Sequence, residues 1–259
     1  MTAGKLHVQS NGQVSGPASI SYNTPFPCVN GSDGSGTMLG VVMHTMVGDL
    51  PGTIAVFNNP SYQASAHFGI AQDGHIHQFG PIGKGWMAWA QVAGNAQWYS
   101  IEHADHGNPN NPLTDAQLTA SAQLVECLSA FADFPLQISD DVTVKGYGVH
   151  FMGGQAWGGH TCPDVPGHHV RSSQRTEILR RAHDIRSPAG GQPGRYVADG
   201  TKSLADVATS SNHGLANIVW LTAGHNPGGF GPIAAKYFDA GDLHAHMPVG
   251  MVYWIPASG

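Results

Sequence analysis

The segment Met38-Leu39-Gly40-Val41-Val42-Met43-His44-Thr45 is a short apolar run that ends in a histidine. A run of this length is too short for most helices and is typical of a strand buried in a sheet. Sites in α/β sheets gather where strands end. We therefore expect a buried strand here and treat His44 as a candidate site residue, although most of the 16 histidines must lie at the surface or serve only as hydrogen-bonding groups.

Further strands are predicted after this segment. Residues 142–150 alternate between apolar and polar side chains and end in a second histidine, His150. Residues 68–70 and 75–79 flank the turn dipeptide Asp73-Gly74, which predicts a two-stranded hairpin.

Amphipathic helices are expected between and after these strands. Residues 51–57 begin with a proline, which suits the first turn of a short helix. Residues 115–134 follow a capping-box pattern and residues 173–185 show helical periodicity. The inward residues are expected to be Leu118, Leu124, Val125, Leu128 and Phe131 in the first of these two helices and Ile178, Leu179, Ala182 and Ile185 in the second. The alternation of strands and helices predicts an α/β fold with a mixed central β-sheet flanked by helices.

A polar, glycine-rich segment carries the strongest signal for chemistry. In Trp157-Gly158-Gly159-His160-Thr161-Cys162-Pro163-Asp164, a histidine and a thiol lie two positions apart, so both point to one side if the segment is extended. Imidazole and thiolate are the ligands that zinc prefers, and a catalytic zinc needs three protein ligands with one position left open. We predict His44, His150 and Cys162 as the ligands. His150 and His160 could exchange roles, but His150 is favoured because it ends a strand.

Four ordered motifs resemble a known family. Val42-Met43-His44-Thr45, the stretch from Ser65 to Ile76, Tyr99-Ser100-Ile101-Glu102, and His150 followed by His160-Thr161-Cys162-Pro163 are similar to the type-2 N-acetylmuramoyl-L-alanine amidases. This family is related to phage lysozymes of the amidase kind and to peptidoglycan-recognition proteins. The resemblance spans about residues 38–185 and implies their fold, a Zn²⁺ cofactor, and cleavage of the amide between N-acetylmuramic acid and L-alanine of the stem peptide.

Glu102 is the candidate general base. It ends a strand-like run among apolar neighbours, where partial desolvation would raise the pKa of its carboxyl group toward the range that a general base needs. The alternative is an ordinary exposed carboxylate at a strand end. In one branch of the resembling family a tyrosine that precedes a histidine assists catalysis, whereas this chain has Ala66 before His67, which favours Glu102 for the role.

Four more residues are expected near the substrate. His160 matches a position where the family often carries a lysine or another donor, so we expect it to donate a hydrogen bond to the developing oxyanion. His67, Trp89 and Trp157 are candidates for substrate binding. A structural hydrogen bond is an equal alternative for His67, and core packing is an equal alternative for the tryptophans.

Composition excludes some classes of partner. The 259 residues carry a formal net charge of −6 with only 11 lysines and arginines, so the chain lacks the basic surface that binds nucleic acid. No apolar run is long enough for membrane insertion, and the first residues have no signal-peptide core. The three cysteines, Cys28, Cys127 and Cys162, do not form a disulfide pattern.

The expected organisation is an N-terminal arm (residues 1–36), a zinc amidase domain (37–187), a glycine- and proline-rich linker (188–195) and a small C-terminal α+β domain (196–259). The last part reads strand, helix, helix, strand (βααβ) and is similar to LysM modules, which bind N-acetyl sugars of cell walls. The segment around residues 239–242 makes a longer insertion than such modules carry, and the alternative is a plain accessory domain.

We therefore expect a zinc-dependent peptidoglycan hydrolase. The predicted role is that of a phage endolysin, which stays in the host cytoplasm until it is released to the bacterial cell wall, or of a virion-associated lysin. The alternatives are a non-catalytic peptidoglycan-binding protein, a structural virion protein with an amidase-like fold, and a cysteine hydrolase in which Cys162 is the nucleophile and His160 the base.

Overall fold

The computed structural model describes residues 5–22, 29–30, 38–83, 86–186, 194–198, 203–211, 245–247 and 252–255. The chain divides into two compact units, Met1–Arg186 and Ser187–Gly259. Among the helices of the described ranges, none is both long enough and apolar enough to span a lipid bilayer.

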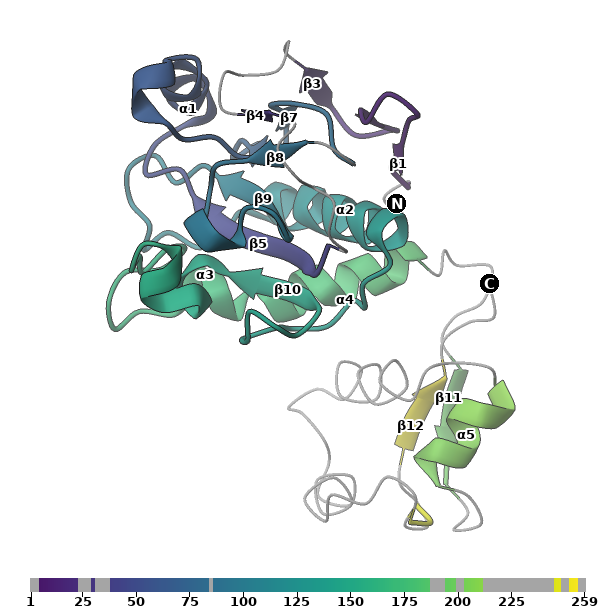
Figure 1. The fold of residues 1–259 in the computed structure, drawn as a ribbon. Helices are drawn as coiled ribbons and strands as arrows, with labels where there is room; N and C mark the ends of the chain where they lie inside the picture. Colours follow the sequence, from purple (N-terminus) through teal and green to yellow (C-terminus); the bar gives the residue numbers. More distant parts are fainter. Residues whose placement is uncertain are drawn as a thin grey trace. The chain divides into compact units, whose positions relative to one another are not determined.

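The first unit is built on a six-stranded mixed sheet (Figure 1). Neighbouring strands are parallel except in the hairpin formed by residues 68–70 and 76–78, which is antiparallel. In spatial order the strands are β10 (Gly146–Val149), β5 (Gly40–Thr45), β9 (Trp98–His103), β6 (Phe68–Ile70), β7 (Ile76–Gln78) and β3 (Ile20–Tyr22). The predicted mixed central sheet is confirmed, and the apolar run that ends in His44 forms an interior strand, between β10 and β9.

Two long helices pack together behind this sheet in Figure 1, namely α2 (Asp115–Ala132) and α4 (Arg175–Arg186), with the short α3 (Val170–Ser173) before α4. The capping box is confirmed, because the Thr114 side chain accepts a hydrogen bond from Gln117 N while the Gln117 side chain accepts one from Thr114 N. The predicted inward residues of α4 are all buried. Phe131 is a correction, since its ring is 47% exposed and lies beside Gly83 at the surface.

Short elements and loops cover the opposite face. They include α1 (Leu50–Phe57), which packs Leu50 and Phe57 against Ala66 and Phe79. The 3-10 helix η3 (His150–Trp157) packs Trp157 against Val42 and Trp98. The remaining short elements are η1 (Pro60–Tyr62), β8 (Met87–Ala88), which pairs with β4 (Val29–Asn30), and η2 (Val92–Gly94).

Two sequence-based expectations fail at element ends. The strand predicted over residues 142–150 begins only at Gly146, because the Asp141 side chain accepts hydrogen bonds from Thr143 N and Oγ1 and closes a turn there. The first residues are not a separate arm either. Strands β1 (His7–Val8) and β2 (Val14–Ser15) form a hairpin that Gln78 Oε1 ties to the sheet at Val14 N, and β3 is an edge strand of the sheet.

The second unit is described only in part. Strands β11 (Gly194–Val197) and β12 (Val252–Ile255) pair antiparallel, and α5 (Leu204–Ser211) follows β11. Strand β11 starts at Gly194, two residues before the predicted start of the C-terminal domain at residue 196. The second predicted helix near residues 218–221, the insertion around residues 239–242, Cys28 and the glycine-rich residues 31–36 lie outside the described residues.

Candidate metal centre and active site

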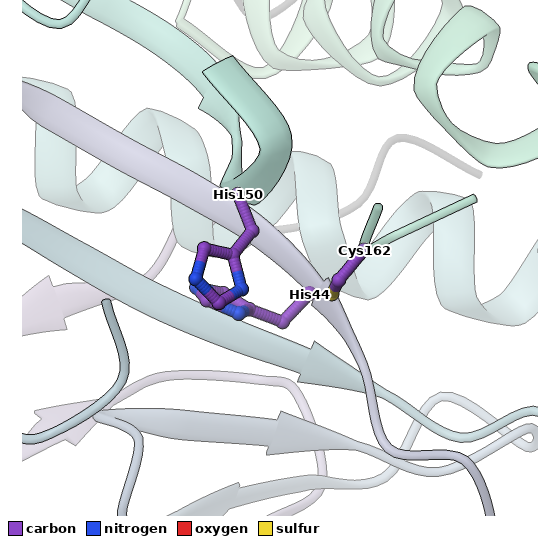
Figure 2. Close-up of side chains that lie close together, drawn as sticks. All are labelled: His44, His150 and Cys162. Carbon is purple, nitrogen blue, oxygen red and sulfur yellow. The ribbon is translucent and has the colours of Figure 1, made fainter. Parts of the chain in front are cut away.

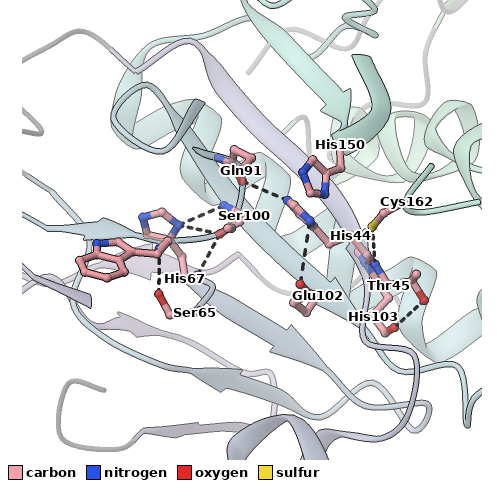
Figure 3. A network of polar contacts seen from close by, with 12 residues as sticks. His44, Thr45, Ser65, His67, Gln91, Ser100, Glu102, His103, His150 and Cys162 are labelled. Atoms are coloured by element: carbon pink, nitrogen blue, oxygen red, sulfur yellow. Dashed lines mark hydrogen bonds and ion pairs between the residues drawn. The ribbon is translucent and has the colours of Figure 1, made fainter. Parts of the chain in front are cut away.

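Three parallel strands bring the candidate residues together at their C-terminal ends. His44 on β5 lies directly opposite Glu102 on β9. Strand β10 pairs with β5 so that Val149 lies opposite Met43, which places the next residue, His150, beside His44. Figure 3 shows His150, His44 and Glu102 side by side at these strand ends. Residues between 48 and 106 positions apart therefore meet because parallel strands end together.

The potential ligand atoms of His44, His150 and Cys162 lie within 4.8 Å of one another (Figure 2). The two imidazole rings are 4.5 Å apart between centroids. Cys162 comes from the loop after η3, and its sulfur accepts a hydrogen bond from Thr45 N at 3.2 Å. One ion could reach all three side chains, and this two-nitrogen, one-sulfur donor set suits zinc.

Hydrogen bonds fix which nitrogen of each histidine is free. Gln91 Nε2 donates to Trp98 O at 2.9 Å, so Gln91 Oε1 is the atom that faces His44 Nε2 at 3.0 Å. His150 Nε2 faces Trp157 O at 2.9 Å. Both acceptors require a proton on Nε2, which leaves Nδ1 of each neutral ring with a free lone pair. The two rings are therefore preset to offer Nδ1 to a metal ion.

Burial keeps these groups neutral in the absence of a cation. Desolvation lowers the pKa of His44 well below its ordinary value, helped by His150, and it also lowers the pKa of His150. Desolvation raises the pKa of the Cys162 thiol and raises that of Glu102 to about 8. A bound cation would favour the thiolate and the carboxylate. The three donors are therefore neutral without a metal ion, and a bound cation would stabilise the thiolate form of Cys162.

Glu102 stands next to the three-residue cluster but is not part of it. Its Oε1 lies 3.9 Å from His44 Nδ1, and because both groups are held neutral this is not an ion pair. Its side chain is 14% exposed, and Oε2 is buried without a hydrogen-bond partner among the described residues. Once a bound cation favours the ionised carboxylate, this unpartnered oxygen can take a proton from a molecule that enters the site.

A cleft of about 540 Å³ opens beside Glu102. Its walls are the loop from Thr45 to Asp49, one side of α1 including Val56 and Phe57, and residues 106–107. The walls combine apolar side chains with backbone and carboxylate oxygens. The cleft is large enough to take a short peptide or a sugar residue next to the metal cluster.

His160 lies at the exposed rim of the cluster. Its ring stacks on that of His150 with centroids 4.8 Å apart, and the left-handed backbone of Gly158 and Gly159 turns the chain toward this position. Of the two histidines that could have exchanged roles, His150 is the one whose nitrogen joins His44 and Cys162 in the cluster. His160 remains available to donate a hydrogen bond from the rim.

The predicted substrate contact through His67 is corrected. Its ring is 1% exposed, and Nδ1 accepts a hydrogen bond from Ser100 N at 3.1 Å. Burial lowers the pKa of His67 to about 3. Ala66, the position of the catalytic tyrosine in one branch of the family, is fully buried in the core under α1. Both positions serve the fold, and Glu102 is the acid beside the cluster.

The buried His67 gives a testable pH dependence. The pKa of His67 in the folded chain lies below the unfolded value of 6.5. Between pH 6.5 and 3 the imidazole is therefore protonated only in the unfolded chain, so the free energy of unfolding decreases as the pH falls through this range. The expected slope from this group is about 1.4 kcal/mol per pH unit. Urea unfolding of His67→Phe should show a shallower acid loss than the wild type. A variant of the exposed His168, His168→Gln, should keep the wild-type slope, and equal slopes in all three would contradict the assignment.

The two tryptophans differ. Trp157 is 4% exposed and fills a slot in which a Cβ on Gly94 would come within 2.6 Å of its indole, so its predicted substrate contact is replaced by a packing role and by the carbonyl that orients His150. Trp89 is half-buried, its backbone N donates to Ser65 Oγ, and its indole nitrogen has no hydrogen-bond partner among the described residues. Substrate binding by Trp89 stays a prediction.

Gln91 is a site residue that the sequence did not reveal. It is fully buried just before η2, with a backbone conformation outside the regular regions, and no periodicity or spacing marks it. Its amide connects the Trp98 carbonyl to His44 Nε2. A glutamine followed by a tight turn is too common a pattern to be read as a metal-site residue from one sequence.

Replacing Gln91 tests the orientation of His44. Gln91→Leu keeps the volume but removes the acceptor for Nε2, so we expect metal affinity to fall about 10- to 100-fold. Gln91→Glu keeps an acceptor and should retain most of the affinity. Competition with a chromogenic chelator measures both variants. Unchanged affinity in Gln91→Leu would show that the ring is held by other contacts.

Comparison with known proteins identifies the family. A family model described as N-acetylmuramoyl-L-alanine amidase matches residues 34–165, about half of the chain. The chain belongs to this family. It is 34% identical over 140 residues to N-acetylmuramoyl-L-alanine amidase A of Achromobacter lyticus, a match that covers 48% of this chain and 77% of that protein. The amidase acts on peptidoglycan, as its family does.

A solved structure supports the fold. The hydrolase AmiA of Staphylococcus aureus, solved in complex with its ligand, superposes with a TM-score of 0.50 at 16% identity and covers 64% of this chain and 84% of that one. At this identity the likeness concerns the fold alone. The sheet flanked by helices is thus the amidase fold that the motifs predicted.

Proposed function

We propose that this amidase is zinc-dependent and that Zn²⁺ is held by Nδ1 of His44, Nδ1 of His150 and Sγ of Cys162. The observation that carries the proposal is the meeting of these three donors within 4.8 Å, with both Nε2 atoms committed to hydrogen bonds. When bound, the ion would supply a Lewis acid for the scissile carbonyl and a water of lowered pKa as nucleophile.

Glu102 would move the proton in this reaction. Its unpartnered Oε2 takes a proton from the attacking water and delivers it to the nitrogen of the leaving L-alanine, while the water oxygen forms the new bond to the lactyl carbonyl carbon and the C–N bond breaks. His160 would donate a hydrogen bond from its exposed imidazole to the oxygen on which negative charge develops. The cleft beside Glu102 would take the part of the substrate that adjoins the amide.

The experiment is metal removal with identification of the bond cleaved. Purified protein should carry about one zinc per chain, lose wall lysis after dialysis against a chelator, and regain it on addition of zinc. Labelling of new amino groups in the digested wall should find N-terminal L-alanine and no new reducing sugar ends. Full lysis by metal-free protein would contradict the proposal.

The rival roles have less support. A thiol nucleophile needs an adjacent base, yet Cys162 receives its hydrogen bond from the Thr45 backbone, and burial raises the pKa of its thiol. A protein that only binds peptidoglycan, or a virion scaffold, would not need the complete donor set together with Glu102. Wall binding without release of stem peptides would restore those alternatives.

We also propose that the amidase is a phage lysin and that residues 196–259 form a LysM-like wall-binding module. The support is a second compact unit that follows the amidase unit, with an antiparallel strand pair and a helix as in the predicted βααβ order. Such a module would raise the local concentration of the enzyme at the wall. Binding of the full chain to purified walls, compared with a chain that ends at residue 187 and retains its circular dichroism, tests the module. Equal binding would contradict it.

The biological role needs its own test. As an endolysin kept in the host cytoplasm, the protein should leave expressing bacteria intact until their membrane is permeabilised with chloroform, and lysis should then be rapid. As a virion-associated lysin it should instead be present in purified particles. Lysis during expression without permeabilisation would contradict storage in the cytoplasm.

A further inference from the structure

A buried arginine lies behind the metal cluster and has no place in the mechanism above. Arg171, on α3, is fully buried. Its guanidinium donates to Thr45 Oγ1 at 3.0 Å and to the backbone carbonyls of Asn111, His103 and Ala104. None of these four acceptors is a carboxylate, so the buried positive charge is not balanced by a direct ion pair. Its compensation must come from groups one contact further away.

Thr45 is the junction that connects this charge to the cluster. Its backbone N donates to Cys162 Sγ at 3.2 Å, and its hydroxyl donates to Asp105 Oδ2 at 2.9 Å. Because the single hydroxyl proton goes to the carboxylate, the oxygen lone pair is left to accept from Arg171 Nη1. One residue therefore joins the thiol, a buried carboxylate and a buried guanidinium.

Two carboxylates complete the network. Asp105 is fully buried, and its Oδ1 accepts hydrogen bonds from the backbone N atoms of Gly48 and Gly107, both of which line the cleft. Asp164, two residues after Cys162 and 4% exposed, accepts through Oδ1 from Arg171 N. With the ligated thiolate, three anionic groups surround one guanidinium, and at low local dielectric their repulsion would be large without it.

We propose that the Arg171 side chain is a positioning group for the metal thiolate, acting through Thr45. The proposal rests on the zinc site proposed above. Through Thr45 the guanidinium sets the place of the N–H group that meets the Cys162 sulfur. The backbone N of Arg171 donates to Asp164 in the loop that carries Cys162, and this contact does not depend on the side chain. The guanidinium charge balances the thiolate when a cation is bound. Loss of these contacts should weaken zinc binding about 10- to 100-fold, as for other groups that orient a ligand.

Three substitutions and one matched control test this role. Arg171→Met removes both the positive charge and the guanidinium N–H donors, whereas Arg171→Lys keeps the charge. Thr45→Val keeps the side-chain volume and the backbone N–H donor but removes the hydroxyl that accepts from Arg171. Arg175 is the control, because it is also a buried arginine whose guanidinium donates to backbone carbonyls, here those of Ser172, Ser139 and Tyr147. It also donates to Asp140 Oδ1, and it takes no part in the contacts of Thr45 and Cys162. Arg175→Met should cost comparable packing without touching the thiol network.

The readouts are zinc affinity, by competition with a chromogenic chelator, and the thiolate-to-metal charge-transfer band of the cobalt-substituted protein. We expect Arg171→Met and Thr45→Val to weaken zinc binding about 10- to 100-fold and to shift or weaken the band, Arg171→Lys to lose less, and Arg175→Met to match the wild type. If Arg171→Met does not fold, Thr45→Val decides.

Two results would overturn the inference while leaving the zinc site intact. The first is that Thr45→Val and Arg171→Met both keep the wild-type zinc affinity and an unchanged charge-transfer band. The second is that Arg175→Met loses as much zinc affinity as Arg171→Met, which would mean that a buried arginine matters here only for packing. A wild-type protein that binds neither zinc nor cobalt would instead overturn the proposed metal site, and this inference with it.

Discussion

Glu102→Gln should lower kcat for wall hydrolysis by about three orders of magnitude, near the middle of the range expected for loss of a positioned general base. The amide has the same shape as the carboxyl group and can occupy the same place beside His44, but its oxygen cannot carry a proton from water to the leaving nitrogen. Zinc content should not change, because the three clustered donors do not include Glu102. KM should change little, since the cleft keeps its shape.

The cleft offers its own control for this experiment. Asp49 also lines it, but this carboxylate caps α1 by accepting from Gly52 N at 2.8 Å. Asp49→Asn keeps a good cap and removes an equal charge, so kcat should stay within about threefold of the wild type. Steady-state release of dye-labelled wall fragments and zinc analysis would compare the two variants. If Glu102→Gln kept more than a tenth of the wild-type kcat, or lost its zinc, the assignment would be wrong.

The part of this site that could be predicted is the part that strand ends determine. His44 ends the most apolar run, and Glu102 ends a strand-like run, so sheet formation alone brings them opposite each other. His150 could be named as well, although its strand is half as long as the alternation suggested. The pattern of residues 142–145 was misleading because the hydrogen bond from Thr143 N to the Asp141 side chain stabilises a turn there, although the residues favour a strand.

Contacts between loops could not be predicted. Gln91 reaches His44 from a turn, and Arg171 reaches Thr45 across 126 positions of sequence. Neither pairing has a period or a motif, and each depends on how α3 and the turn before η2 pack on the sheet. Trp157 was misread for a related reason, because the slot that buries it exists only through the approach of Gly94. Glycines in a sequence indicate that the backbone can adopt unusual conformations, but they do not predict which side chain the folded backbone will bury.

The N-terminal residues show a limit of pattern length. Ile20–Tyr22 contributes only three residues to the sheet, all half-buried, so its alternation is too short to distinguish from a polar arm. Its pairing with β7 is supported by side-chain contacts of Ser21 Oγ with His75 Nε2 and His77 Nδ1. These contacts become visible only in the folded chain.

Cys162→Ala should abolish both zinc binding and lysis. One of three protein donors disappears. If each supplies about a third of the ~10–16 kcal/mol typical of zinc bound in proteins, affinity falls by roughly 300- to 8,000-fold. Metal analysis and turbidity loss on bacterial walls, measured on the same preparation, would record both effects. This variant alone does not separate a ligand from a nucleophile, because either role ends with the thiol.

Cys162→Asp makes that separation. A carboxylate oxygen can bind zinc and restores the negative charge next to Arg171 and Thr45, but it cannot replace a thiol that attacks the amide. If Cys162 is a ligand, Cys162→Asp should retain measurable zinc and a fraction of the lytic rate, and both should disappear together on addition of a chelator. If it retains zinc but shows no hydrolysis, while metal-free wild type still lyses walls, the thiol is the nucleophile. The same pair of variants therefore tests the metal site and the chemistry independently, since zinc content and rate are read separately in each.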